Sequence, residues 1–93
     1  MNAKAKGTRN EHRSMALYET LGYETLRSAA SLSTWDFVAW NNTEVVFCQV
    51  KTSRWPGSNE MEIIKEAVVP PNGRKVVHRW MPRKHAPDVK EIL

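Results

Sequence analysis

The sequence lacks the features that mark secreted, membrane-spanning or repetitive proteins. Cys48 is the only cysteine, so neither an internal disulfide nor a cysteine-rich zinc site can form. No apolar run approaches the roughly 18 residues that cross a bilayer, and no apolar stretch follows the basic N-terminus as it would in a signal peptide. We therefore expect a cytoplasmic protein without membrane association, in which Cys48 is a buried, reduced thiol.

A length of 93 residues predicts a single small domain. A chain this short buries only about 60–65% of the surface that its unfolded form exposes. Its core is therefore thin, and we expect a homodimer because association would bury more surface. The ends are basic, and we expect residues 1–7 and 82–93 to form arms, the second being either loose or a short helix from Pro87.

The formal net charge is +4, and the basic residues gather in two segments. The first segment holds Lys4, Lys6, Arg9 and Arg13 with one acid, Glu11; the second holds, without an acid, Arg74, Lys75, Arg79, Arg83 and Lys84. Two such clusters can follow a phosphate backbone and gain affinity by releasing counterions. The alternative interpretation is a solvated surface that keeps the protein soluble, and the composition does not separate the two.

Hydrophobic periodicity and turn residues predict an α/β protein with the element order αβββαβ around a mixed central sheet. The first helix is predicted to start at a Thr8–Glu11 capping box and to end before Gly22. Asn41, Asn42 and Thr43 mark a hairpin turn. The expected elements are a helix over 8–21, strands over 23–27, 35–40 and 44–52, a helix over 58–68, and a strand over 74–80.

The third predicted strand carries the residues of most chemical interest. Side chains alternate across a sheet, so Gln49 and Lys51 share one face while Val50 points to the other. If the hairpin loop holds two or four residues, positions that sum to 85 lie opposite one another, and Asp36 then faces Gln49. The sequence thus predicts an acid, an amide and an amine together on one hairpin, with Glu11 joining them if the first helix packs on the same face.

This set of groups suits a divalent cation such as Mg²⁺ or Mn²⁺. Mg²⁺ takes oxygen ligands, usually one or two carboxylates with water and substrate phosphate. We expect Asp36 to be the central ligand, and the Gln49 side chain and the Val50 carbonyl to supply neutral oxygens. Such a metal polarises a phosphate and activates water, while Lys51 stabilises the charge that develops on the phosphorane.

These motifs resemble those of the PD-(D/E)XK nucleases. In that signature a helix-borne acid and an Asp precede Glu/Gln-x-Lys on the next strand, within an αβββαβ core. The sequence is most similar to Holliday junction resolvases of the archaeal type and their bacterial and phage relatives. The resemblance covers residues 7–52 and rests on Gly7-Thr8-Arg9-Asn10-Glu11-His12-Arg13, Leu21-Gly22-Tyr23, Arg27-Ser28-Ala29-Ala30-Ser31, Trp35-Asp36-Phe37-Val38-Ala39 and Gln49-Val50-Lys51-Thr52.

The resemblance implies a role for each matched position. Glu11 becomes a metal ligand or water-orienting acid, Asp36 the main metal ligand, and Lys51 the catalytic lysine. The resemblance also implies that four further residues hold DNA: Arg9, Arg13, Arg27 and Ser31. Two positions depart from the signature. Gln49 replaces the usual acid, as in Mrr-type restriction nucleases, and this replacement lowers the expected metal affinity. Trp35 stands where proline is common.

Arg54 and Trp55 lie in a turn-rich segment and are also candidates for contacting DNA, with Trp55 stacking on a base or wedging a junction. A cap over the thin core is the equal alternative for Trp55. We therefore interpret the chain as a metal-dependent endonuclease that acts on branched DNA such as Holliday junctions. The alternatives are a nuclease without junction preference, a degenerate DNA-binding module of the same fold, and a protein-interaction module.

Overall fold

The computed structural model describes residues 3–28 and 34–93, and it has a mixed α/β fold with the order αβββαββ. The elements are α1 (Ala3–Thr20), β1 (Glu24–Arg27), β2 (Phe37–Trp40), β3 (Val45–Thr52), α2 (Ser58–Glu66), β4 (Gly73–Trp80) and β5 (Asp88–Ile92). The predicted α/β class and mixed sheet are confirmed. Neither described helix is long and apolar enough to cross a membrane.

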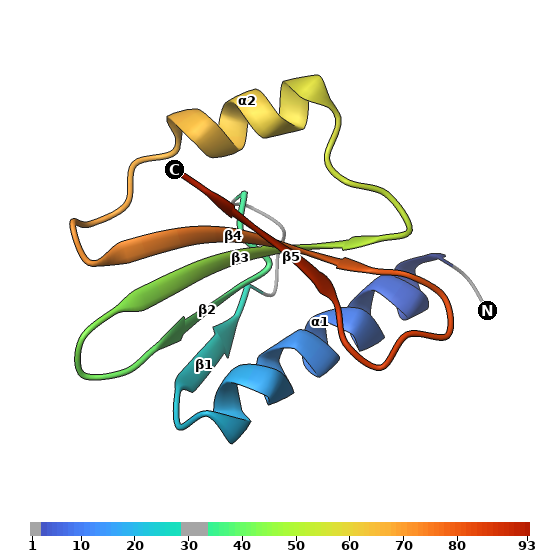
Figure 1. Ribbon diagram of the computed structural model, residues 1–93, viewed down its shortest axis with the longest axis horizontal. Coiled ribbons are helices and arrows are strands. Elements are labelled where there is room, and N and C mark those ends of the chain that lie inside the picture. Colours follow the sequence, from blue (N-terminus) through green and yellow to red (C-terminus); the bar gives the residue numbers. More distant parts are fainter. Residues whose placement is uncertain (1–2, 29–33) are drawn as a thin grey trace.

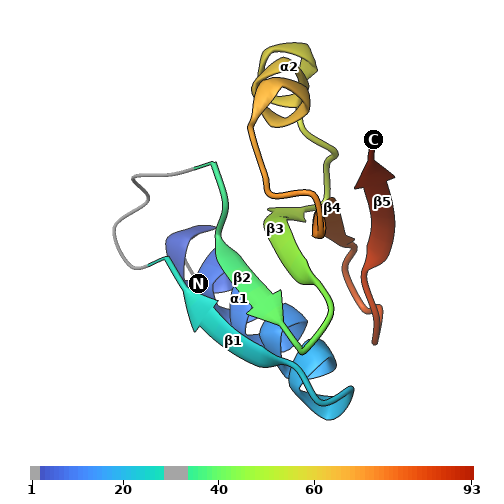
Figure 2. The same cartoon turned by 90° about the vertical axis from the view of Figure 1, so that its left-hand side faces the viewer.

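The five strands form one sheet in the order β1-β2-β3-β4-β5. Only β3 and β4 are parallel, and α2 makes the crossover between them, as parallel neighbours require. The remaining pairs are antiparallel. The helices cover opposite faces of this sheet, with α1 below and α2 above it in Figure 1; in Figure 2 the strands run from β1 at the left to β5 at the right.

Alternation along β3 separates two hydrophobic clusters. Val46 and Cys48 are fully buried on the α1 face with Phe37 and Ala39, and Met15 and Tyr18 of α1 pack against them. The opposite cluster beneath α2 is smaller and is formed by Ile64, Val77 and Ile92, with Trp35, Trp55 and Met61 around it. Cys48 is a buried free thiol, as predicted. The core thus lies mainly between α1 and the sheet.

Helix α1 begins earlier than the sequence predicted. It starts at Ala3, five residues before Thr8, so the predicted capping box at Thr8 and Glu11 is wrong. Alanine and lysine are strong helix formers and extend the helix upstream. The predicted end is correct: Gly22 has φ +89°, and the Gly22 N–H and Tyr23 N–H donate to the carbonyls of Glu19 and Tyr18, as in a Schellman motif.

The β2–β3 hairpin has the predicted register. Phe37 pairs with Cys48 and Trp40 with Val45, so paired positions sum to 85. The loop of residues 41–44 is closed by Asn41, whose Oδ1 accepts hydrogen bonds from the N–H groups of Thr43 and Glu44 at 2.9 and 3.0 Å. The core faces of both strands therefore match, and this register fixes where the polar side chains of β3 lie.

The C-terminal segment differs from the expected arm or short helix, because residues 88–92 form the edge strand β5. Ile92 is buried in the α2-side cluster. The edge is further held by two ion pairs, from Arg79 to Asp88 at 2.7 Å and from Arg74 to Glu91 at 3.0 Å. These cross-strand partners are far apart in sequence, so the local pattern did not reveal the strand. Residues 3–7 of the expected N-terminal arm are likewise helical.

A buried polar network joins α1 to β4. Ser14 Oγ accepts a hydrogen bond from Trp80 Nε1 at 2.8 Å and lies 2.9 Å from His78 Nδ1. Tyr18 Oη lies 3.4 Å from His78 Nε2, and the two rings stack. Burial lowers the pKa of His78 to about 4 and raises that of Tyr18. Both side chains are therefore neutral in the folded protein near neutral pH.

The buried imidazole predicts an acid-sensitive fold. Below pH 6.5 an unfolded histidine binds a proton, whereas folded His78 stays neutral down to about pH 4. Stability should therefore fall as the pH falls, by about 1.4 kcal/mol per pH unit within this window from His78 alone. Urea unfolding between pH 7 and pH 4.5 should show a steeper loss for the wild type than for His78→Asn. Equal pH dependence in the two proteins would contradict this assignment, and an NMR titration of His78 tests it directly.

Candidate active site

The predicted site residues lie where β2 begins and β3 ends. Asp36 immediately precedes β2, and Gln49 and Lys51 lie in the last four residues of β3. The Asp36 N–H donates to the Cys48 carbonyl at 2.9 Å, and the Asp36 carbonyl accepts from the Ser28 N–H at 2.9 Å. Asp36 is therefore fixed between β1 and β3 through its own backbone, although it lies just outside the strand.

The carboxylate of Asp36 is also fixed. Its Oδ2 accepts a hydrogen bond of 2.7 Å from the Val50 N–H. Burial raises the pKa of Asp36, and the nearby charge of Glu11 adds to this effect, while the Val50 hydrogen bond, Lys51 and Arg27 act in the opposite direction. The charges of Glu11, Lys51 and Arg27 thus all act on Asp36, and the structure gathers these four groups into one electrostatic site.

Gln49 has a buried side-chain oxygen that makes no hydrogen bond to the described residues. Its Nε2 donates to the Thr34 carbonyl at 3.2 Å, which fixes the direction of the amide. The Oε1 atom is buried and has no hydrogen-bond partner among the residues that the structure describes. A buried polar atom without a partner costs about 1–3 kcal/mol, so its persistence calls for a reason such as a bound ion.

Lys51 has a partner that the sequence did not reveal. Its Nζ lies 3.1 Å from Glu60 Oε2 on α2, and the hydrogen bond to Lys51 is the main cause of the lowered pKa of Glu60. Glu60 is the N3 residue of α2, where its side chain also accepts from the Gly57 N–H at 3.3 Å. Its position in the first turn was the only sequence signal, and that signal indicates helix capping. Glu60 therefore positions the lysine ammonium.

Glu11 reaches the site from the other side of the sheet. Val50 packs on the α1 face, whereas Lys51 turns toward α2, so Glu11 does not share the face of Gln49 and Lys51 as the prediction required. Glu11 Oε1 instead accepts from Arg27 Nε at 2.8 Å. The charges of Glu11 and Lys51 nevertheless both affect the pKa of Asp36, Glu11 raising it and Lys51 lowering it.

The donor set fits a hard divalent cation. Across residues 3–28 and 34–93, no three His, Cys, Asp or Glu side chains group closely enough to form a site of their own. What is present is the Asp36 carboxylate, the orphaned Gln49 oxygen and a second acid, Glu11. Because the N–H and C=O of a strand residue point to the same side, the Val50 carbonyl also faces Asp36. Mixed carboxylate and neutral oxygens are the ligands that Mg²⁺ takes.

The residues predicted to contact DNA lie in several different parts of the structure. Arg27 extends toward α1 and pairs with Glu11, while Arg9 and Arg13 line a pocket at the N-terminal half of α1. Arg54 is exposed after β3. Ser31 lies outside the described residues. Trp55 packs beneath α2, with the Arg79 guanidinium and the Lys90 ammonium 4.5 and 4.6 Å from its ring centre; this packing favours the capping interpretation.

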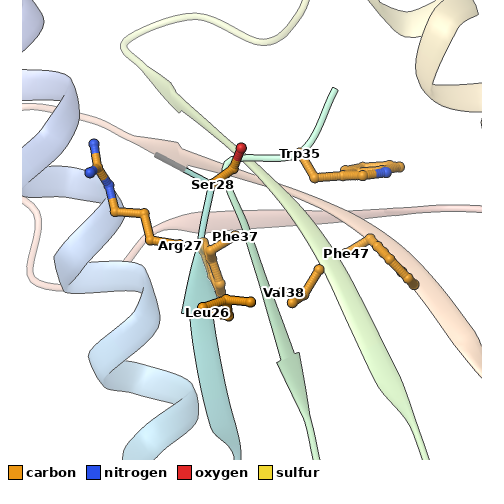
Figure 3. Close-up of a pocket in the computed structure, with 7 residues that line it drawn as sticks. All are labelled: Leu26, Arg27, Ser28, Trp35, Phe37, Val38 and Phe47. Carbon is orange, nitrogen blue, oxygen red and sulfur yellow. The ribbon is translucent and has the colours of Figure 1, made fainter. Parts of the chain in front are cut away.

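An apolar pocket of about 260 Å³ adjoins the charged groups (Figure 3). Its walls come from Leu26, Val38 and Phe47 of the sheet face that α2 leaves open, and from Trp35, the residue before Asp36. In Figure 3 the Arg27 side chain leaves this pocket and extends toward α1. The site thus combines a charged region with an aromatic wall, which match the two chemical parts of a nucleotide.

No protein-family model and no curated protein sequence matches this chain. Its structure is similar to that of Hjc, a Holliday junction resolvase from the hyperthermophilic archaeon Archaeoglobus fulgidus. The TM-score is 0.70 at 21% sequence identity, over 94% of this chain and 71% of that chain. The chain has the resolvase nuclease fold. This likeness establishes the expected fold, whereas the roles of the individual site residues stay predictions.

The raised pKa of Asp36 predicts how two substitutions affect stability. A folded carboxyl with a raised pKa holds its proton more tightly than the unfolded chain does, so its stabilising contribution is lost as the pH rises through the folded pKa. At pH 7 in EDTA, Asp36→Asn should therefore melt at the same temperature as the wild type or higher. Asp36→Ala should lose about 1–3 kcal/mol, because the Val50 N–H loses its acceptor. An Asn variant that is as unstable as the Ala variant would show that the charge itself holds the fold.

Proposed function

We propose that this protein is a metal-dependent endonuclease that hydrolyses phosphodiester bonds of DNA. The observation that carries the proposal is the Asp36 carboxylate, which is held by the Val50 N–H and influenced by the charge of Lys51, together with the buried, unpartnered oxygen of Gln49 on the same strand as Val50 and Lys51. Perturbed ionisable groups that cluster in this way are typical of functional sites. The resolvase nuclease fold supports the same reaction class, since the one similar protein described above is named a resolvase.

Each residue has a role that follows from its surroundings. Asp36, Gln49 and the Val50 carbonyl would hold Mg²⁺ or Mn²⁺, with Glu11 as a further ligand or as the acid that orients water. When bound, the cation polarises the phosphate and lowers the pKa of water. Lys51, positioned by Glu60, stabilises the negative charge of the transition state. Arg27 orients Glu11 through their ion pair of 2.8 Å.

We infer that branched DNA, such as a Holliday junction, is the preferred substrate. The fold is that of a protein named a Holliday junction resolvase. The apolar pocket with Trp35 and Phe47 offers a surface for an unpaired base, which branched DNA presents more readily than a duplex. A homodimer would place two sites about a two-fold axis and suit paired cuts on a four-way junction.

A catalytically inactive DNA-binding module of the same fold is the second candidate. The replacement of the usual acid by Gln49 removes one negative charge, and Glu60 already pairs with Lys51. Both features weaken a nuclease site without affecting the basic surface. Such a protein would bind DNA in a salt-sensitive manner and would not cleave it with either metal.

Cleavage of a labelled four-way junction and a matching linear duplex tests the function. With Mg²⁺ or Mn²⁺, the wild type should introduce paired nicks in the junction and cut the duplex more slowly. Asp36→Asn and Lys51→Ala should each lower the rate by a factor of about 100 or more, since Asp36 would hold the cation and Lys51 would stabilise the transition-state charge. Lys65→Ala, which removes an exposed cation on α2, is the matched control and should cleave like the wild type.

Three outcomes of that assay are informative. Equal rates on junction and duplex would remove the junction preference and leave a general nuclease. Tight binding without cleavage would favour the inactive module, and Gln49→Glu would then be the variant expected to restore the missing charge. Cleavage that persists in EDTA or in Asp36→Asn would contradict the metal site at Asp36.

Metal binding can be measured without cleavage. A ligand at ten times its Kd stabilises the folded state by about 1.4 kcal/mol. Mg²⁺ or Mn²⁺ should therefore raise the melting temperature of the wild type, have no such effect on Asp36→Asn, and act on Gln49→Glu at lower metal concentrations. An equal shift in wild type and Asp36→Asn would place the bound metal elsewhere.

A further inference from the structure

The two basic segments of the sequence meet at one pocket. This basic pocket, of about 250 Å³, is lined by residues of the N-terminal half of α1 and of the turn that follows β4. These two segments are drawn next to each other at the right of Figure 1. Lys6, Arg9 and Arg13 come from the first segment and Arg83 from the second, and Asn10 and Trp80 lie between them. No Asp or Glu belongs to its lining. The pocket thus concentrates four formal positive charges without an acid among its walls.

Three other cations of the second segment, Arg74, Lys75 and Arg79, have structural partners. Arg74 pairs with Glu44 and Glu91, and Arg79 pairs with Asp88. Lys75 Nζ donates to three carbonyls at the C-terminal end of α2, those of Ile64, Lys65 and Ala67, at 2.8–3.0 Å. These side chains hold the sheet and α2 together. Arg83 differs from them because it faces the basic pocket.

The groups that hold Arg13 in the described part of the chain are neutral. Its guanidinium lies 3.9 Å from the centre of the Trp80 ring and donates to Asn10 Oδ1 at 3.2 Å and to the Lys84 carbonyl at 3.0 Å. None of these contacts cancels its charge. A guanidinium that is oriented in this way is prepared to bind an anion, and phosphate suits its planar set of donors.

Arg83 adopts a backbone conformation that is unfavourable for its residue type. Its φ is +66°, in the left-handed region where glycine is preferred. A non-glycine residue held there costs on the order of 1 kcal/mol, and such residues cluster at functional sites. Ser53 has the same feature, with φ +71°, but does not line the basic pocket. The presence of an arginine in this unfavourable conformation at the rim of the basic pocket indicates that its positive charge has a role there.

The basic pocket is coupled to the candidate active site through Asn10. Asn10 is 4% exposed and precedes Glu11 in α1, and its Nδ2 donates to Thr52 Oγ1 at 2.9 Å. Thr52 in turn follows Lys51 at the end of β3. Asn10, which lines the pocket, is thus next to Glu11 in α1 and is hydrogen-bonded to the residue after Lys51 in β3, so the pocket lies beside the candidate active site.

We propose that the basic pocket binds a phosphodiester of the DNA strand next to the one that is cleaved. Arg13 and Arg83 hold its oxygens, and Lys6 and Arg9 add positive charge. This site fixes the strand in register with Asp36 and supplies affinity without taking part in the reaction. The proposal rests on the proposed function, because it takes DNA as the ligand.

The test compares DNA binding by variants that change charge with variants that change only the backbone. Binding of a fluorescent four-way junction is followed by anisotropy in EDTA over a range of salt concentrations. Arg83→Gly removes the charge and relaxes the backbone, so it should bind DNA on the order of tenfold more weakly, as for one lost charge-assisted hydrogen bond, with no loss of thermal stability. Its plot of log K against log salt should lose about one unit of slope. Lys6→Gln should act in the same direction.

Two controls separate charge from structure. Ser53→Gly relaxes the same kind of backbone strain without removing a charge, and Lys65→Gln removes one charge from the exposed surface of α2. Both should bind DNA as the wild type does. If Arg83→Gly binds like these controls, with an unchanged salt slope, the phosphate site is overturned even though DNA binding and the proposed function stand.

A second arm uses inorganic phosphate and the indole N–H signal of Trp80 in NMR spectra. Phosphate should shift this signal in the wild type and shift it less in Arg83→Gly. If the wild type binds phosphate in this way but does not bind DNA at any salt concentration, both the proposed function and the assignment of DNA as the ligand are overturned, and a free phosphate compound takes its place. The absence of any shift together with unaltered DNA binding would leave no anion site at this pocket.

Discussion

The antiparallel pairing of β2 with β3 determines where Asp36 lies relative to Gln49, Val50 and Lys51. Pairing of Phe37 with Cys48 buries both side chains against α1 and thereby brings Asp36 opposite the Val50 N–H. A shift of one residue would expose the core face and bury the polar one, so the register is specified by the hydrophobic core rather than by the site. The Asn41 turn adds a local constraint at the other end of the hairpin. The geometry of the site therefore depends on the packing of Phe37 and Cys48 against α1, although neither side chain belongs to the site.

Two sets of polar residues differ in whether their polar atoms have partners within the described part of the protein. Ser14, His78 and Trp80 are buried, and their side-chain polar atoms all have partners within the network. Asp36 and Gln49 are different: burial opposes the ionised form of Asp36, and the Gln49 oxygen lacks a partner among the described residues. Natural proteins keep such unfavourable arrangements mainly where a ligand compensates for them. This difference supports a ligand at Asp36 and a purely structural role for the His78 network.

Much of the fold could be predicted because it follows from short-range patterns. Alternation in β3, the turn at Asn41 and the glycine at position 22 each act over a few residues, and each prediction was confirmed. Features that depend on distant partners could not be predicted. The strand β5 is held by Ile92 beneath α2 and by pairs with Arg74 and Arg79. The pairing of Lys51 with Glu60 likewise requires α2 to be placed over the sheet, and the early start of α1 reflects helix propensity where a capping signal was expected.

The role of the basic residues was the most difficult to predict, because composition does not show which charges are compensated. Some of the cations in this small domain stabilise its own elements. Arg74 and Arg79 form ion pairs with β5, and Lys75 caps the C-terminal end of α2. Arg13 and Arg83 take part in none of these contacts, and both line the basic pocket at the N-terminal half of α1. This region adjoins Glu11, and through Asn10 it adjoins the end of β3. A negatively charged strand that approaches α1 from this end therefore meets Arg13 and Arg83 first. The charge of the strand is then already partly neutralised when it reaches the carboxylate of Asp36.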